Sequence, residues 1–139
     1  MNKKKLLVIH PALAPYRIDF FNRLSENFDS KFYFEHRNLK DQKFNQQKLI
    51  SLCNFRLNYL DKGIEFLNRS FKFGFSLALF KEKPDLVLCS EYGYGTILTF
   101  LYKKLFFKKY KIFVISDDSV DNSKNRKGSR KTLRNYISK

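Results

Sequence analysis

The sequence contains three short, almost unbroken runs of apolar residues, and these leave few possible folds. The runs are KLLVIH (5–10), DLVLCS (85–90) and KIFVIS (111–116). Apolar runs of this length are typical of strands that are buried on both faces of a parallel sheet. Parallel strands need crossover connections, which are usually helices, so the runs predict an α/β fold.

The segments between these runs fit that prediction. Pro15 suits the first position of a helix, and Pro84 would end one. Helices are expected over 15–28, 71–83, 96–107 and 124–139, two further strands over 31–36 and 55–60, and a loop over 37–47. Right-handed crossovers then give a Rossmann-like parallel sheet in the order 3-2-1-4-5, with helices on both faces. We expect one domain that spans residues 1–139.

The charge of the chain limits its partners. The formal net charge is +15, and twelve Lys or Arg but only three Asp lie in residues 103–139. Such a surface attracts nucleic acid, acidic lipid headgroups or phosphorylated substrates. The chain is also rich in Lys, Asn, Phe and Tyr, so solvated surface charge without a specific partner is the alternative.

The remaining composition favours a packed cytosolic protein. Apolar residues make up 43% of the chain, which is enough for a core. No run of about 18 apolar residues is present, so no membrane-spanning helix is expected. Cys53 and Cys89 have no metal-binding or redox spacing, and we expect both to be reduced thiols.

The loop after the first strand, HPALAPYR (10–17), has two prolines and no glycine. It therefore lacks the GxGxxG pattern of dinucleotide sites, and no P-loop, zinc spacing or GxSxG motif occurs elsewhere. No metal and no cofactor are expected to bind this chain.

Ligands of open α/β sheets bind beyond the carboxyl ends of the strands, where the strand order reverses. We expect the polar residues at these ends to share one crevice rim: His10, Tyr16, Arg17, Glu91, Tyr92, Asp117 and Asp118. Each also has a structural alternative. A strand-end histidine can simply bond the backbone, an arginine can be surface, and paired aspartates can cap the next segment.

Three blocks in order resemble the N-terminal, acceptor-side domain of GT-B glycosyltransferases of the family 4, or group 1, type. They are LLVIHPALAPYRIDFFNRL (6–24), KPDLVLCSEYGYGTILTFLYKK (83–104) and KIFVISDDSVDNSKNRKGSRKTLRNYI (111–137). The resemblance covers nearly the whole chain. It implies a partial, C-terminally incomplete acceptor domain without the donor-binding domain, so that a nucleotide sugar binds only when that second domain is supplied.

The resemblance also implies roles for residues. His10, Tyr16, Arg17, Tyr92 and Asp118 would bind the acceptor, and Glu91 and Asp117 would orient its hydroxyl. The acceptor would be a glycan or a lipid-linked glycan, and the protein would be cytoplasmic, at the inner face of a membrane. Alone, the chain would be inactive. It would be an N-terminal fragment, a truncated gene product, or one half of a split enzyme whose partner is a separately encoded donor domain.

A binding module is the competing reading. Lysines alternate with aromatic residues in YKKLFFKKYK (102–111), as in proteins that bind single-stranded nucleic acid by charge and stacking. Most of these aromatic residues are expected in the core, so nucleic acid is not the expected partner. A non-catalytic partner subunit with the same fold is the third alternative.

Overall fold

The predicted apolar strands form one parallel sheet. The computed structural model describes residues 3–38, 43–60, 64–66, 69–71, 74–90, 93–115 and 135. In chain order the strands of the sheet are β1 (Lys5–His10), β2 (Asp29–Phe34), β3 (Leu57–Tyr59), β6 (Leu86–Ser90) and β7 (Lys111–Ile115). Their spatial order is β3-β2-β1-β6-β7, and every neighbouring pair is parallel. Counted along the chain this is 3-2-1-4-5, so the predicted Rossmann-like fold is confirmed.

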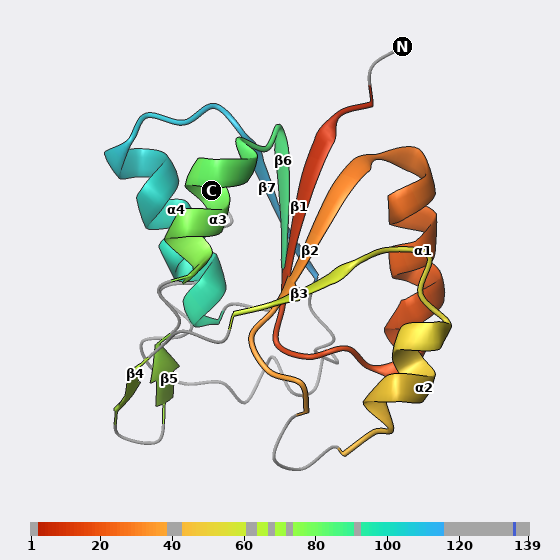
Figure 1. The fold of residues 1–139 in the computed structure, drawn as a ribbon. Helices are drawn as coiled ribbons and strands as arrows, with labels where there is room; N and C mark the ends of the chain where they lie inside the picture. Colours follow the sequence, from red (N-terminus) through yellow and green to blue (C-terminus); the bar gives the residue numbers. More distant parts are fainter. Residues whose placement is uncertain are drawn as a thin grey trace.

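Helices cover both faces of this sheet (Figure 1). One face carries α1 (Ile18–Asn27), which follows the 3₁₀ turn η1 (Pro15–Arg17), and the short helix α2 (Gln46–Ser51). The other face carries α3 (Gly74–Glu82) and α4 (Tyr94–Leu105), which pack side by side. Among the described residues, no helix has the length and apolar character needed to cross a bilayer.

The central strand β1 is apolar throughout because both of its faces are covered. Successive side chains of a strand point to opposite faces. Val8 therefore packs in the cluster that contains Phe21 of α1, and Leu7 packs in the cluster that contains Phe75 of α3. These four side chains are almost completely buried. Each buried side chain of this kind stabilises the fold by about 1.5–3 kcal/mol, so the sheet is fixed from both sides.

Three elements differ from the sequence-based expectations. The helix α2 begins inside the predicted loop 37–47, where the Asn45 side chain accepts a hydrogen bond from the Lys48 amide at 3.1 Å. A hairpin of β4 (Ile64–Phe66) and β5 (Arg69–Phe71) was not predicted, because strands of three residues carry no readable period. Phe71 belongs to this hairpin, so α3 begins at Gly74 rather than at residue 71.

The remaining boundaries shift by a few residues. The second strand starts and ends two residues earlier than predicted, and the third is shorter. The helix predicted over 124–139 lies outside the described residues, except for Asn135, which is helical.

Candidate functional site

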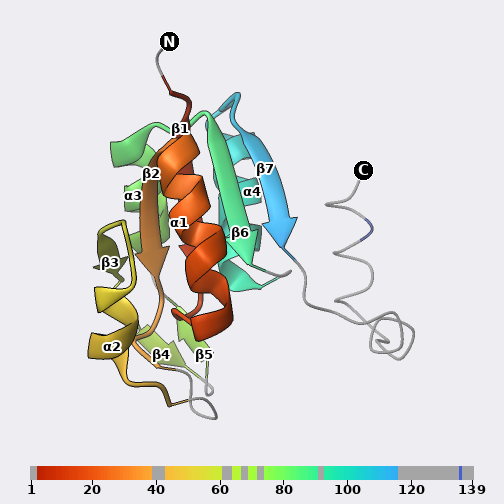
Figure 2. The same ribbon diagram turned by 90° about the vertical axis from the view of Figure 1, so that its right-hand side faces the viewer.

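The carboxyl ends of the parallel strands meet at one edge of the sheet (Figure 2). β1 lies between β2 and β6, so the strand order reverses at this position. In this fold class, ligands bind beside that reversal. We therefore take the carboxyl edge around the end of β1 as the candidate site.

His10, the last residue of β1, faces the interior rather than an open crevice. Its side chain is buried, and its ring stands edge-on to the rings of Phe21 and Phe34, with centroids 5.4 and 6.3 Å away. Its Nδ1 lies 2.8 Å from the Ala12 carbonyl oxygen, which can only accept, so Nδ1 carries the proton. This geometry fits the structural alternative, in which His10 holds the loop that follows it.

Tyr16 and Arg17 lie on η1. Tyr16 is 64% exposed, and Arg17 is half-buried with its guanidinium 5.5 Å from the Tyr16 ring centroid. A tyrosine face with a planar cation beside it suits a ligand that carries hydroxyl or anionic groups. Of the described members of the predicted set, Tyr16 is the exposed one, and the Arg17 guanidinium lies beside its ring.

The loop between β1 and α1 offers no cradle for a diphosphate. Ala12, Leu13 and Ala14 are buried, so the loop is filled by its own side chains. Pro15 has no amide hydrogen, and the Arg17 amide donates to the Ala14 carbonyl oxygen at 3.0 Å. Two of the amides that could bind a phosphate at this helix start are therefore missing or engaged within the turn.

Glu35 belongs to the candidate site and was not predicted. Its amide donates to the His10 carbonyl oxygen at 3.1 Å, which places it directly beside the end of β1. Its carboxylate reaches the start of α4, because its Oε1 is 3.5 Å from where a Cβ on Gly95 would stand. A negative charge is favourable at a helix N-terminus, and a carboxylate in this position can accept hydrogen bonds.

Two residues, Tyr94 and His36, lie near this carboxylate. Burial raises the pKa of the Tyr94 hydroxyl above its ordinary value, and the charge of Glu35 adds to that effect. The His36 Nε2 lies 3.9 Å from the Glu35 Oε2.

Glu35 was missed because of one strand boundary. The predicted boundary of the second strand, 31–36, placed Glu35 inside the strand. The true strand ends at Phe34, and the rule that ligand residues follow strand ends would then have selected Glu35.

The other predicted site residues lie outside the described part of the chain. These are Glu91, Tyr92, Asp117 and Asp118. Gly93, which follows the first pair, is the N-cap of α4, and among the described residues beyond its chain neighbours no atom lies within 4 Å of where its Cβ would stand. Among the residues that are described, no cluster of three or more His, Cys, Asp or Glu could hold a metal ion.

Two cavities lie at the opposite, amino edge of the sheet. One has a volume of about 290 Å³ and is lined by residues at the end of α3 and by the segment before β7. The other, of about 250 Å³, is lined by the starts of β1 and β2 and by the end of α3. Pro84 lines both, so the cavities adjoin. Neither coincides with the candidate site at the carboxyl edge.

The aromatic segment 102–111 divides between core and surface. Tyr102 and Tyr110 are buried, and the Tyr110 hydroxyl donates to the Thr99 carbonyl oxygen at 2.7 Å. Phe106 and Phe107 are exposed, which differs from the expectation that most of these rings lie in the core.

Comparison of the chain with protein families, with curated proteins and with solved structures found no match.

Proposed function

We propose that this chain is the acceptor-binding half of a glycosyltransferase that transfers a sugar from a nucleotide sugar to a glycan or a lipid-linked acceptor. One observation carries the proposal: the carboxyl edge presents Tyr16, Arg17 and Glu35 beside a loop that cannot cradle a diphosphate. Hydroxyl-rich ligands are recognised by such groups, since a carboxylate accepts and a guanidinium donates. The ordered resemblance of three sequence blocks to GT-B acceptor domains supports the same assignment.

In this proposal the sugar nucleotide is held by a second domain outside these 139 residues. The chain therefore has no transferase activity alone. Glu91 and Asp117 remain the candidates for orienting the acceptor hydroxyl, and Glu35 joins them as a hydrogen-bond acceptor. We further propose that the protein acts in the cytoplasm, at the inner face of a membrane that carries the acceptor.

Acceptor binding by the chain itself tests the proposal. Saturation-transfer NMR with a panel of oligosaccharides and lipid-linked glycans should identify a ligand that the chain binds without any nucleotide sugar. Arg17→Ala should weaken that binding about tenfold or more, because a charge-assisted hydrogen bond contributes about 1.5–3 kcal/mol. Arg23→Ala is the matched control, because Arg23 is an exposed arginine on α1 that lies outside the candidate site.

Transfer activity then separates the alternatives. Radiolabelled sugar transfer that requires a separately supplied donor domain, and that Arg17→Ala slows, supports the enzyme. Binding without transfer in that reconstituted pair indicates a non-catalytic partner subunit. Turnover by the purified 139-residue chain alone would contradict the division of roles between two domains.

A further inference from the structure

The end of α4 exposes apolar side chains that the fold does not use. We call residues 104–109, with the sequence KLFFKK, the α4 tip. Leu105 is 71% exposed and Phe107 is 90% exposed, while Phe106 rests on Tyr102 with ring centroids 4.6 Å apart. Single exposed apolar residues are common, but a leucine and two phenylalanines in succession form a patch.

The backbone holds Phe107 outward at a cost. Phe107 has φ 48°, in the left-handed region where glycine is the usual residue after a helix. Its amide points to the Lys104 carbonyl oxygen at 3.4 Å, and the Lys108 amide donates to the Lys103 carbonyl oxygen at 3.0 Å. This is the Schellman ending, with a bulky side chain in the position that favours glycine. Strain of this kind tends to mark functional positions, and packing gives no other reason for a phenylalanine here.

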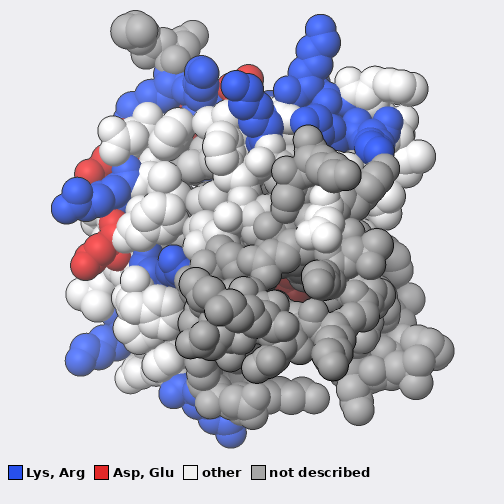
Figure 3. All heavy atoms as spheres, turned by 180° about the vertical axis from the view of Figure 1, so that it is seen from behind, with Lys and Arg blue, Asp and Glu red and all other residues white. Residues whose placement is uncertain are grey.

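Lysines surround the tip. From Gly93 to Ile115 the sequence has five lysines, at 103, 104, 108, 109 and 111, and no acidic residue. Figure 3 shows lysine and arginine side chains along the upper edge of the molecule, the edge at which α4 ends. Lysines at a helix C-terminus are favourable on their own. That effect accounts for Lys103 and Lys104, and it leaves Lys108 and Lys109 beyond the helix unexplained.

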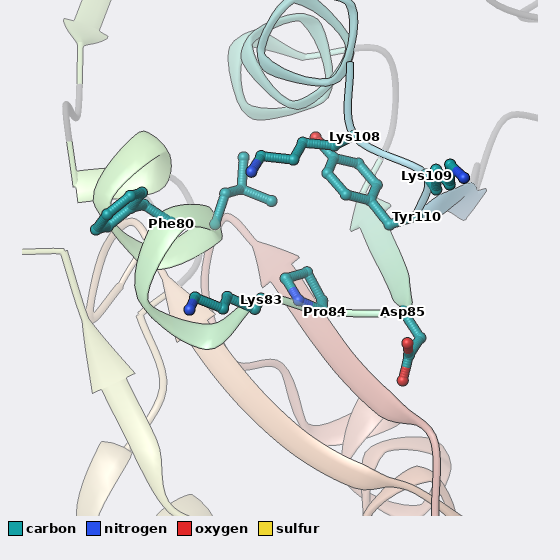
Figure 4. A pocket seen from close by; sticks show the side chains of 8 residues that line it. Phe80, Lys83, Pro84, Asp85, Lys108, Lys109 and Tyr110 are labelled. Atoms are coloured by element: carbon teal, nitrogen blue, oxygen red, sulfur yellow. The ribbon is translucent and has the colours of Figure 1, made fainter. Parts of the chain in front are cut away.

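The larger cavity connects the tip to α3. It is lined by Phe80 and Lys83 at the end of α3 and by Lys108, Lys109 and Tyr110 after α4. In Figure 4 the Lys83 and Lys108 side chains run toward the side on which Phe80 stands. Phe80 is itself 62% exposed. The lining therefore combines three lysines, one carboxylate at Asp85 and an exposed ring, and this set of net positive charge matches a phosphate headgroup that lies beside an acyl chain.

We propose that the α4 tip and this cavity dock the protein on an anionic lipid surface. Leu105 and Phe107 insert among the acyl chains, and the lysines bind the phosphates of the headgroups. An interfacial contact of this type needs apolar burial together with electrostatic attraction to acidic lipids, and the tip supplies both. The inference does not depend on the glycosyltransferase assignment.

Other occupants fit the surface less well. Single-stranded nucleic acid stacks on aromatic rings, but Leu105 offers no ring. A second copy of the chain, paired by twofold symmetry, would bring two lysine clusters into contact with each other. Lipid is the occupant that uses both Leu105 and the positive charge.

Flotation of the full chain with vesicles tests the proposal. The chain should bind vesicles of phosphatidylcholine and phosphatidylglycerol at a ratio of about 3:1, and bind pure phosphatidylcholine far more weakly. The double variant Lys108→Glu and Lys109→Glu should reduce binding at least about 25-fold, since each lysine near such a surface contributes about fivefold. The variant Lys43→Glu and Lys48→Glu is its control, because both side chains are exposed near α2 and the change in net charge is equal.

The apolar contribution to vesicle binding is tested by a tip variant and a matched control variant at α2. Leu105→Ser with Phe107→Ser should weaken vesicle binding about tenfold or more, because two inserted side chains are lost. Ile50→Ser with Leu52→Ser, at exposed positions around the end of α2, should leave it unchanged. Equal effects of the tip variants and their α2 controls would overturn the proposal.

A fluorescent probe reports insertion directly. The chain contains no tryptophan, so Phe107→Trp gives a signal from the tip alone. Its emission should shift to the blue on anionic vesicles and be quenched by brominated acyl chains, whereas Leu52→Trp should show neither change. Unchanged emission of the Phe107→Trp variant on vesicles would refute insertion.

Two other results would assign the surface to a different occupant. If a single-stranded oligonucleotide binds in a salt-sensitive way, and the lysine variant loses this binding while vesicle binding persists, the surface binds nucleic acid instead. A dimer that the Leu105→Ser and Phe107→Ser change dissociates, with no vesicle binding, would assign it to a second copy.

Discussion

Replacing Phe107 by glycine should make the protein more stable although it removes a large apolar side chain. The left-handed conformation costs an L-residue about 1–2 kcal/mol, and glycine avoids that cost. Glycine also has more freedom in the unfolded chain, and this lowers the free energy of unfolding of the variant by about 0.4–1 kcal/mol. Phe107 is 90% exposed, so little burial is lost with its ring. The net expectation is a gain of about 0.5–1 kcal/mol in the free energy of unfolding.

Denaturant unfolding followed by circular dichroism measures this difference. The midpoint should rise with no change in slope, and Tm should rise by about 2–4 °C for a chain of this length. Phe107→Ala is the control that isolates the backbone, because alanine removes the ring but keeps the Cβ that makes the conformation costly. Its stability should match that of the original chain.

A second position allows the same reasoning to be checked. Among the described residues, Lys83 is the other non-glycine with a positive φ, at 45°, so Lys83→Gly should also stabilise. Phe106→Gly should do the opposite, because Phe106 has φ −106° and packs on Tyr102. If Phe107→Gly and Phe107→Ala unfold at the same denaturant concentration, the explanation by strain is refuted.

Further changes probe the core and the thiols. Gly95→Ala should destabilise by about 1–2 kcal/mol in thermal unfolding, because its Cβ would stand 3.2–3.3 Å from buried side chains of β1 and α3. Tyr110→Phe should cost about 1 kcal/mol in the same measurement by removing the hydrogen bond to the Thr99 carbonyl oxygen; an unchanged Tm would contradict that bond. Burial raises the pKa of the Cys89 thiol to about 11, so about one molecule in a thousand is thiolate at pH 8, and Cys89 should react with a thiol reagent far more slowly than the half-buried Cys53.

The sheet was predictable because long-range packing and local pattern agree in it. A strand that is covered on both faces has to be apolar at nearly every position, and the central strands β1 and β6 show this directly in the sequence. The run that forms β7 was expected to be buried as well, but β7 is the edge strand of the sheet and its Phe113 is half exposed. The order of the strands followed from the handedness of the crossovers. The short elements α2, β4 and β5 were missed because three to six residues carry no period, and their positions depend on contacts far along the chain.

The candidate site was predictable only where it follows directly from a strand end. Tyr16 and Arg17 were selected because the loop after β1 is identified by its prolines, and the structure places both in the turn η1 at the end of that loop. His10 was selected by the same rule, but whether a strand-end ring faces solvent or the core depends on packing against Phe21 and Phe34. Glu35 was missed through a two-residue error in one strand boundary, which moved it from the strand end into the strand.

The exposed tip of α4 could not have been predicted from apolar content alone. Leu105 and Phe107 continue the apolar pattern of a helix that packs one side on the core, and the sequence does not show that the chain leaves the sheet there. The turn after the helix, which Phe107 forms in the left-handed conformation, is what places these residues in solvent. A glycine at this position would form the same turn with less strain, so stability alone does not explain the phenylalanine.

The two proposals together restrict the acceptor. The α4 tip lies at the amino edge of the sheet, and the candidate site lies at the carboxyl edge. β1 has six residues and rises about 3.3 Å for each, so the edges are separated by about 20 Å. A protein docked through the tip holds its candidate site at roughly that height above the headgroups. A lipid-linked acceptor must therefore extend about 20 Å from the membrane, so lipid-linked glycans of several sugars should be used in preference to a single sugar on the same lipid. A reconstituted enzyme that prefers the single-sugar lipid on anionic vesicles would show that docking and acceptor binding do not occur together in this arrangement.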